Sequence, residues 1–251
     1  MNVGVASLDR LKEDKKYSII LPTYNERENL PLMLWMINKH LGELDNIIYE
    51  VIIVDDNSPD GTFLVAKQMQ ELYDSTKLKI LRRSGKLGLG SAYADGLKMA
   101  NGDFVFLMDA DLSHHPKFMT KFIEKQKENN NDIVVGTRYV PGGGVAGWDF
   151  IRIITSRGAN LLASLFLPCT SSDLTGSYRL YKKEVLERLI DEVKSKTYVF
   201  QLEILVRAEN LGYSIAEFPI NFVDRIYGES KLGTNEVITY IKGVWNLFCE
   251  T

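Results

Sequence analysis

The chain contains the stretch Phe104-Val105-Phe106-Leu107-Met108-Asp109-Ala110-Asp111, an apolar run that ends in two aspartates one residue apart. Such a run predicts a buried strand, so the two carboxylates lie where the strand ends. Ligands of α/β sheets bind at the carboxyl ends of the strands, and carboxylate oxygens bind divalent cations. The stretch therefore predicts a divalent cation that holds a phosphorylated ligand. The alternative is that both aspartates cap the next helix, because aspartate is a common N-cap residue.

Predicted strands and helices alternate around this stretch. Apolar runs predict strands at residues 17–21, 51–54, 78–81 and 104–108, and Pro22 is expected to end the first. Helical spacing and end signals predict helices at residues 29–41, 62–73 and 92–100. The alternation predicts an α/β fold, with a Rossmann-like and mostly parallel sheet flanked by helices on both faces. Because no linker interrupts the 251 residues, we expect a single domain.

The glycines after the third predicted strand do not fit two common nucleotide-binding folds. Gly88-x-Gly90 does not follow the first strand, and Tyr93 stands where a dinucleotide fingerprint has glycine. Gly85-Lys86 is followed by Leu87, where a phosphate-loop NTPase has Ser or Thr. Both folds are therefore disfavoured.

Acidic residues follow three of the predicted strands. Glu26 follows the first strand, Asp55 and Asp56 follow the second, and Asp109 and Asp111 follow the fourth. In a parallel sheet these strand ends share one edge, so the carboxylates are expected to converge on one crevice. Their mutual repulsion requires a cation, or hydrogen-bond donors such as those of a base and a ribose.

Composition excludes several function classes. The net charge is −3, from 30 basic and 33 acidic residues, so nothing attracts the whole chain to nucleic acid. The two cysteines, Cys169 and Cys249, are far apart in the sequence and give little support for a disulfide or a zinc site. No apolar run reaches the ~18 residues that a membrane-spanning helix needs. We therefore expect a protein that is not integral to a membrane by itself.

Several motifs resemble the family 2 inverting glycosyltransferases of GT-A fold. The early motifs are Pro22-Thr23-Tyr24-Asn25-Glu26, residues 54–62, Gly88-Leu89-Gly90 and residues 109–116. Three later motifs, at residues 136–139, 173–181 and 224–233, are similar to those of the dolichyl-phosphate mannose synthases. The resemblance extends from about Tyr17 to the C-terminus.

The resemblance implies metal-dependent, inverting transfer of mannose from GDP-mannose to dolichyl phosphate. The product would be dolichyl β-D-mannosyl phosphate, for glycoprotein N-glycosylation and GPI-anchor synthesis, and the cofactor Mg²⁺ or Mn²⁺. The chain is similar to the short eukaryotic form without transmembrane helices. That form implies small transmembrane partner subunits and a peripheral position on the cytosolic face of the endoplasmic reticulum membrane.

The resemblance also assigns roles to individual residues. Contacts to the nucleotide sugar are implied for Pro22, Tyr24, Glu26, Val54, Asp56, Asp109, Ala110, Asp111, Arg225 and Lys231. Catalytic roles are implied for Asp111, Arg138 and Arg225, acceptor-phosphate contacts for Arg138, Ser156 and Arg157, and metal ligation for Asp109, Asp111 and Ser113. Glycines at 228 and 233 favour a late loop that closes over the phosphates.

A phosphate acceptor changes what the catalyst must do. Its second pKa is about 6, so it is largely anionic at neutral pH. We hypothesise that no general base is required and that arginines orient the acceptor. Asp173 is the rival base, and the alternative for Asp173 is a brace for the loop before Arg179.

Two segments are candidates for membrane contact. The amphipathic stretch Trp148 to Leu167 carries Arg152 and Arg157 and suits an anionic bilayer surface, or packs on the core. The apolar face of residues 235–251 predicts a C-terminal helix that docks on the bilayer, on a partner or on the catalytic domain. We thus divide the chain into a polar lead-in (1–16), a GT-A domain (17–234) and this helix.

Two alternative functions stay open at this point. The same early motifs fit a dolichyl-phosphate glucosyltransferase that uses UDP-glucose. A catalytically silent scaffold that binds nucleotide sugars belongs to a different class. Thermal stabilisation of the protein by GDP rather than UDP would favour the mannosyltransferase over the glucosyltransferase. A metal-dependent transfer assay would distinguish an enzyme from a silent scaffold.

Overall fold

The computed structural model describes residues 15–44, 47–73, 76–195, 199–225, 227 and 234–250, with the backbone alone at 234–238 and 250. The strands are β1 (Lys15–Thr23), β2 (Ile47–Asp55), β3 (Leu78–Arg82), β4 (Phe104–Leu107), β5 (Ile133–Thr137), β6 (Gly144–Ala146), β7 (Arg179–Lys182), β8 (Ile215–Pro219) and β9 (Asn221–Val223). The helices are α1 (Leu30–Leu41), α2 (Thr62–Leu72), α3 (Leu89–Leu97), α4 (Met119–Asn129), α5 (Phe150–Phe166), α6 (Lys183–Glu192), α7 (Phe200–Asn210), α8 (Thr234–Glu250) and the short 3-10 helix η2 (Pro116–Phe118).

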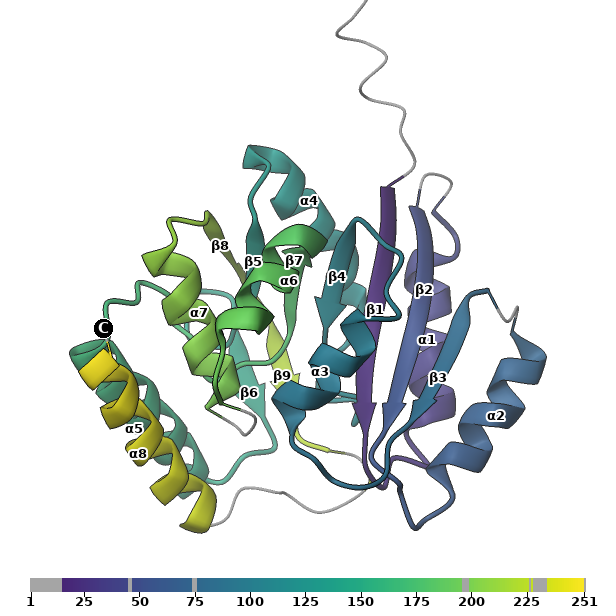
Figure 1. The fold of residues 1–251 in the computed structure, drawn as a ribbon, viewed down its shortest axis with the longest axis horizontal. Helices are drawn as coiled ribbons and strands as arrows, with labels where there is room; N and C mark the ends of the chain where they lie inside the picture. The colour runs from purple at the N-terminus through teal and green to yellow at the C-terminus, as the bar shows by residue number, and fades with distance from the viewer. Residues whose placement is uncertain are drawn as a thin grey trace, which may run out of the picture.

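The main sheet has seven strands in the order β3-β2-β1-β4-β7-β5-β8 (Figure 1). Neighbouring strands are parallel except β7, which is antiparallel to both β4 and β5. A small second sheet pairs β6 with β9. The predicted mostly parallel α/β sheet is confirmed. Since β1 lies between β2 and β4, the carboxyl ends of these three strands meet at one edge of the sheet.

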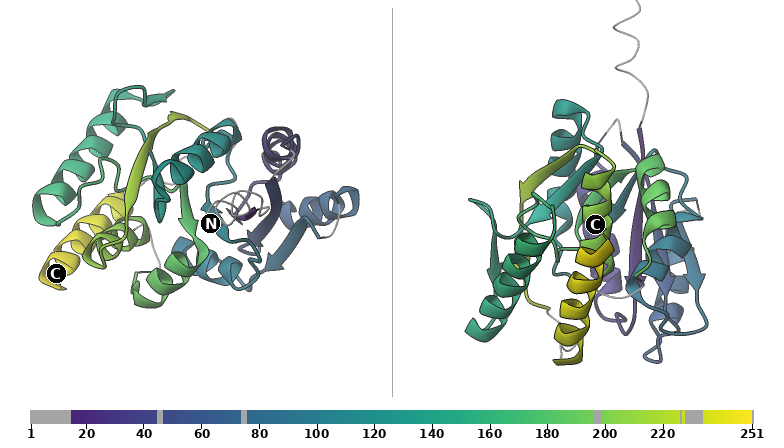
Figure 2. Two further views of the ribbon diagram at one scale, coloured as in Figure 1. Left: turned by 90° about the horizontal axis from the view of Figure 1, so that it is seen from above. Right: turned by 60° about the vertical axis from the view of Figure 1, so that its left-hand side comes forward.

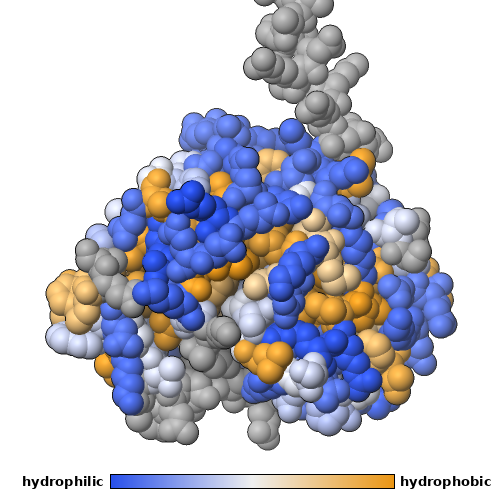
Figure 3. All heavy atoms as spheres, in the orientation of Figure 1, coloured by the Kyte–Doolittle hydropathy of each residue, from blue (hydrophilic) through white to orange (hydrophobic). Residues whose placement is uncertain are grey.

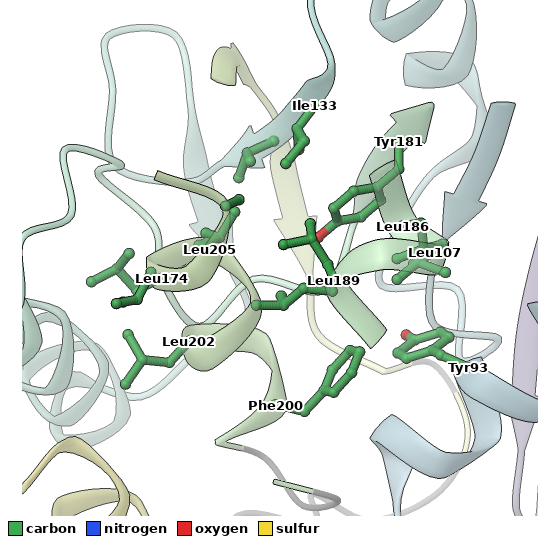
Figure 4. Packing of buried hydrophobic residues seen from close by; sticks show 14 of the residues in the cluster. Tyr93, Leu107, Ile133, Leu174, Tyr181, Leu186, Leu189, Phe200, Leu202 and Leu205 are labelled. Carbon is green, nitrogen blue, oxygen red and sulfur yellow. The ribbon is translucent and has the colours of Figure 1, made fainter. Parts of the chain in front are cut away.

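Helices cover both faces of the sheet, as Figure 2 shows from above. One apolar core lies under α1 and α4 and takes in Leu30, Ile37 and Phe122. The other lies under α3, α6 and α7, where side chains of the two later helices point toward Tyr93 and Leu107 (Figure 4). Burying a large apolar side chain stabilises a fold by about 1.5–3 kcal/mol, so two such cores hold the sheet edge rigidly.

Several elements begin or end elsewhere than predicted, among them β2, which begins at Ile47 rather than at Val51. Strand β1 runs on through Pro22, which pairs with Val54 of β2, and it begins at Lys15, inside the predicted polar lead-in. Its ladder with β4 ends at Ile20, so the missing proline N–H lies beyond that ladder, where it costs little. Helix α3 spans Leu89–Leu97, so it begins and ends before the predicted helix at residues 92–100. The remaining lead-in, residues 1–14, lies outside the described residues.

Helices α5 and α8 lie side by side at one end of the molecule (Figures 1 and 2). Phe166 of α5 meets Phe248 of α8 edge to face, with ring centroids 5.6 Å apart. The helices keep many apolar side chains in solvent, namely Phe150, Ile151, Ile154, Leu161, Leu165 and Phe166 on α5 and Ile241, Trp245 and Phe248 on α8. By contrast, hydrophilic residues cover most of the face that α3, α6 and α7 form (Figure 3). We call the exposed α5 and α8 residues the apolar ridge.

Among the helices that the structure describes, none combines the length and the apolar character needed to cross a bilayer.

Candidate active site

The carboxyl ends of β1, β2 and β4 form the edge at the bottom of Figure 1. Hydrogen bonds tie the loops after β1 and β2 to each other. The Asn25 N–H donates to Ser58 Oγ over 3.1 Å, and the Glu26 N–H donates to Thr62 Oγ1 over 3.0 Å. These hydrogen bonds, from backbone N–H groups to side-chain hydroxyls, hold the acidic residues of the two loops near one another.

Asp111 is a buried carboxylate in the loop after β4. One of its oxygens, Oδ1, accepts hydrogen bonds from both the backbone and the hydroxyl of Ser113. The other, Oδ2, lies 2.7 Å from Nε of Arg225. Burial alone would raise the pKa of Asp111, but Arg225 and Ser113 outweigh it and lower the pKa. Leu112 has a φ of 66°, a left-handed conformation that non-glycine residues rarely adopt and that marks functional loops.

Asp109 is more open than Asp111, with 29% of its side chain exposed. Its Oδ2 accepts a hydrogen bond from the Ser177 hydroxyl over 2.8 Å, and its backbone N–H donates to Nδ1 of His114 over 3.1 Å. Burial lowers the pKa of His114. Because Nδ1 accepts a hydrogen bond, His114 is neutral, and its 3.8 Å approach to the Asp109 carboxylate is not an ion pair. His114 therefore fixes the backbone of Asp109 without adding charge.

The two aspartates fit a divalent cation. Magnesium binds through one or two protein carboxylates and completes its shell with substrate phosphates and water. In the part of the chain that the structure describes, no cluster of three or more His, Cys, Asp or Glu residues offers a fuller cage. The Ser113 hydroxyl donates to Asp111, so it orients that ligand. The capping alternative is wrong for the next helix, since His115 caps η2 by accepting the Lys117 N–H.

Asp56 is a second buried carboxylate, directly after β2. Arg83 reaches it with Nη1 3.0 Å from Oδ1. Burial raises the pKa of Asp56 in spite of this arginine. Arg83 is itself buried, and its Nη2 donates to the Ser91 hydroxyl at the start of α3. The arrangement holds the carboxylate in a fixed place.

Glu26 and Tyr24 occupy the loop after β1. Glu26 is buried and accepts a hydrogen bond from the Asn29 amide over 2.7 Å. Lys86, in the glycine-rich loop before α3, has its ammonium 4.9 Å from the centroid of the Tyr24 ring. This contact joins the first and third loops of the edge.

Three predicted nucleotide contacts lie deeper in the fold. Pro22 lies within β1, and Val54 is fully buried in β2, where it faces Gly96 of α3. A Cβ on Gly96 would lie 3.1 Å from a Val54 methyl carbon, so the valine side chain packs under the helix. Ala110, between the two aspartates, is 2% exposed. Val54 and Ala110 thus lie in the core beside the edge, whereas Pro22 is partly exposed.

Arg138 and Asp173 form a buried, two-pronged ion pair. Nε and Nη2 of Arg138 donate to the two carboxylate oxygens over 2.6 Å each. Asp173 also accepts the backbone N–H groups of Arg138 and Gly176, and Arg138 donates to Thr175. Burial would raise the pKa of Asp173, but Arg138 lowers it. The carboxylate is saturated with donors, which supports a bracing role over that of a free base.

Aromatic rings surround the Arg138 guanidinium. Its carbon lies 5.2 Å from the ring centroid of Tyr139, 5.4 Å from that of Trp148 and 5.6 Å from that of Phe222. Arg152 of α5 lies over the same Trp148 ring at 4.3 Å. The two guanidinium groups therefore share one indole beside the β6–β9 sheet, and each is also paired with a carboxylate, Asp173 or Asp224.

Ser156 and Arg157 both contact Tyr139, whose ring also lies beside the Arg138 guanidinium. The Ser156 and Tyr139 hydroxyls lie 2.6 Å apart, and the Arg157 guanidinium lies 5.8 Å from the Tyr139 ring centroid. A pocket of about 420 Å³ opens beside them, lined by Tyr139, Arg157, Asn160, Leu161, Ser164 and residues 169–172. The structure thus brings the three predicted acceptor contacts around one tyrosine.

The late loop is described only in part. Arg225 follows β9 and joins the site through Asp111. Asp224 pairs with Arg152, with Oδ1 2.9 Å from Nη1. Lys231 and most of the predicted phosphate-closing loop lie outside the described residues.

Comparison with known proteins decides the family. The glycosyl transferase family 2 domain matches residues 18–190. The chain belongs to glycosyl transferase family 2. This glycosyltransferase is 37% identical over 223 residues to the polyprenol monophosphomannose synthase of Mycolicibacterium smegmatis, covering 87% of this chain and 82% of that one. It is 38% identical over 235 residues to the dolichol-phosphate mannosyltransferase of Pyrococcus furiosus, covering 92% of this chain and 63% of the relative.

Solved structures share the fold. A glucosyl-3-phosphoglycerate synthase from Mycobacterium tuberculosis has a TM-score of 0.70 at 19% identity, over 96% of this chain and 83% of that one. A mannosyltransferase from Pyrobaculum calidifontis, in complex with GDP-Man and Mn²⁺, has a TM-score of 0.64 at 20% identity, over 95% and 65%. The predicted family, enzyme class and GT-A fold are confirmed.

Several residues that shape the glycosyltransferase site were not predicted. His114 and Ser177 hold Asp109, and Arg83 holds Asp56. His114 and Ser177 stand inside the motifs that carry the family resemblance, so the motif boundaries were a signal for them. Arg83 follows β3 with no motif around it, and only the fold places it opposite Asp56.

Proposed function

We propose that this glycosyltransferase transfers mannose from GDP-mannose to dolichyl phosphate or a related polyprenyl phosphate, with inversion, to give a β-linked mannosyl phosphate. The names of the two relatives at 37% and 38% identity support this substrate pair. As the finer part of the proposal, the product serves glycoprotein and GPI-anchor synthesis.

One observation carries the proposal. A carboxylate pair, Asp109 and Asp111, and a separate arginine group, Arg138 and Arg152, are linked through Arg225 and its neighbour Asp224. A transfer between a sugar diphosphate and a lipid phosphate needs two anion-binding regions that meet at the anomeric carbon. The carboxylates suit a cation-bound diphosphate, and the arginines suit the acceptor phosphate.

The chemistry follows from these residues. A divalent cation, held by Asp109 and Asp111, would neutralise charge that develops on the leaving diphosphate. Arg225 adds a guanidinium at the same place, and Arg138, fixed by Asp173, orients the acceptor phosphate. No proton has to be removed from a phosphate that is already anionic. The saturated hydrogen bonding of Asp173 supports this mechanism without a general base.

We further propose that the apolar ridge rests on the membrane that carries the lipid, on the cytosolic face of the endoplasmic reticulum, with small transmembrane subunits as partners. The exposed fractions of Phe150 (75%), Ile151 (77%) and Leu165 (71%) support burial in a nonpolar medium. Arg157, on the same helix beside the pocket, suits an anionic headgroup.

A transfer assay tests the function. The purified chain is incubated with GDP-mannose, a polyprenyl phosphate and Mg²⁺ or Mn²⁺, and GDP release and mannosyl lipid are measured. We expect release that requires both the lipid and the metal. Transfer from UDP-glucose but not from GDP-mannose would replace the proposal with the glucosyltransferase alternative. Nucleotide binding without transfer from either donor would favour a scaffold.

A further inference from the structure

We propose that Arg225 is a stand-in counter-ion for Asp111, which a divalent cation must displace, so that metal and diphosphate bind cooperatively. The inference rests on the proposed function, because it concerns the metal and the diphosphate of that site. What it adds is that Arg225 and the metal compete for the carboxylate of Asp111.

The first step is the environment of Asp111. Only 2% of the residue is exposed, and a buried carboxylate needs a compensating charge to stay ionised. Ser113 occupies Oδ1 with two hydrogen bonds, which leaves Oδ2 to face the guanidinium of Arg225 at 2.7 Å. Asp111 is thus neutralised by the chain itself.

The second step is a conflict of space and charge. A Mg²⁺ ligand bond is about 2.0–2.1 Å long, so a metal on Oδ2 would occupy the space beside Nε of Arg225. Two cations on one carboxylate oxygen repel each other strongly in a poorly hydrated site. Metal binding at Asp111 therefore requires the arginine to move away.

The third step is that Arg225 is able to move. Its side chain is 20% exposed, and it meets Asp111 through Nε on a residue that follows β9. Arg138 makes a useful contrast, since its side chain is 7% exposed and both prongs of its guanidinium are engaged by Asp173. Of these two arginines, Arg225 is the one whose partner can be exchanged.

The consequence is a coupling between ligands. A diphosphate offers Arg225 a new anionic partner and offers the metal additional oxygen ligands. Metal alone must break the Asp111 pair without that compensation, so it binds weakly. By reciprocity, each ligand then raises the affinity of the other.

The test measures metal binding without catalysis. Mn²⁺ affinity is determined by electron paramagnetic resonance for the wild-type protein, for Arg225→Gln and for Arg157→Gln, with and without GDP. Arg157→Gln is the matched control, because it also removes one positive charge, from an exposed helix position that contacts Tyr139. Thermal unfolding checks that every variant is folded.

We expect Arg225→Gln to bind Mn²⁺ about tenfold more tightly than the wild type in the absence of GDP, equivalent to about 1.4 kcal/mol. Arg157→Gln should leave the affinity within about twofold. Equal or weaker Mn²⁺ binding by Arg225→Gln, or an equal gain in both variants, would overturn the inference and leave the proposed function intact. Absence of Mn²⁺ binding in every sample, GDP included, would overturn both.

A second measurement uses the wild-type protein alone, so it does not depend on whether a variant folds. In the wild type, the Nε–H resonance of Arg225 is followed by nuclear magnetic resonance while Mg²⁺ and GDP are added. We expect it to shift as the Asp111 partner is lost. A resonance that does not move while GDP and Mg²⁺ bind would contradict the displacement.

Discussion

Two of the arginine–aspartate pairs of the site differ in kind. Arg138 and Asp173 have side chains that are 7% and 0% exposed, and both prongs of the guanidinium are bound. Arg225 and Asp111 are 20% and 3% exposed and meet through Nε. The first pair joins the loop after β5 to the loop before β7. The second joins the loop after β4 to the segment after β9.

The difference shows that the same two residue types can form a structural pair at one place in the site and an exchangeable pair at another. A buried pair joined by two charged hydrogen bonds cannot release one partner without stranding the other. In a pair with a partly exposed arginine, the carboxylate can exchange the arginine for a metal, and the arginine can exchange the carboxylate for a phosphate. We therefore assign the Asp173 pair to positioning and the Asp111 pair to binding.

Asp173→Ala should have the largest effect on folding. It leaves the Arg138 guanidinium buried without its carboxylate, and such a loss costs about 3–5 kcal/mol. Urea unfolding monitored by circular dichroism measures the free energy of unfolding. Arg225→Ala is the comparison and should cost less, because Arg225 is 20% exposed and Asp111 keeps both of its hydrogen bonds from Ser113. Equal losses in the two variants would remove the distinction between the pairs.

Asp111→Asn should have the largest effect on turnover. It removes the charge that binds the metal while keeping the shape, and the loss of one preorganised electrostatic contact costs about 10²–10³-fold in kcat. Transfer kinetics with GDP-mannose and a polyprenyl phosphate measure it. Asp173→Asn, in contrast, should mainly raise KM for the lipid, because Arg138 loses its anchor. A collapse of kcat in folded Asp173→Asn with KM unchanged would instead make Asp173 the general base.

A change on the apolar ridge should leave both pairs alone. Leu165→Glu places a charge on a side chain that is 71% exposed, so stability should change by no more than about 0.5 kcal/mol. Binding to anionic vesicles should weaken about tenfold, since burying one leucine contributes about 1.5–3 kcal/mol. Leu64→Glu on α2, at a site 67% exposed, is the matched control. Equal vesicle binding by all three proteins would argue against the ridge as the membrane face.

Acid should weaken both pairs, with the smallest effect near neutral pH. The pKa values of Asp111 and Asp173 are lowered from 3.8 by their arginines and hydrogen bonds, against the effect of burial. A carboxyl with a lowered folded pKa stabilises the fold above its unfolded pKa and loses this contribution as pH falls through the folded pKa. The contribution of these two carboxyls to stability should thus be constant from about pH 5 to 7 and fall below about pH 4.

Urea unfolding across this pH range measures the effect, and Asp173→Asn should show a shallower acid decline than the wild type. An equal slope in both proteins would show that Asp173 does not contribute to acid sensitivity.

The sequence predicts the fold and the acidic edge well for a physical reason. Apolar runs such as residues 51–54 and 104–108 need burial on both faces, which requires a parallel sheet under helices. Once the strands are parallel, Asp56, Asp109 and Asp111 must share an edge. These conclusions depend on local patterns and on topology alone.

Side-chain partners depend on tertiary packing and were harder to predict. Val54 was expected at the base pocket, yet the close approach of Gly96 draws its side chain under α3. Nothing local says that Arg83 faces Asp56 or that Arg138 turns toward Asp173, since each pair joins distant segments. The role predicted for Lys231 stays a prediction.

The central claim is that Asp109 and Asp111 seat a divalent cation that holds the diphosphate of GDP-mannose. Crystals soaked with GDP-mannose and Mn²⁺ test it through the anomalous scattering of manganese. The account predicts an anomalous peak within ligand distance of both carboxylates and of the diphosphate, with Arg225 turned from Asp111 to phosphate. A nucleotide bound away from this edge, or a peak that touches neither aspartate, would contradict it.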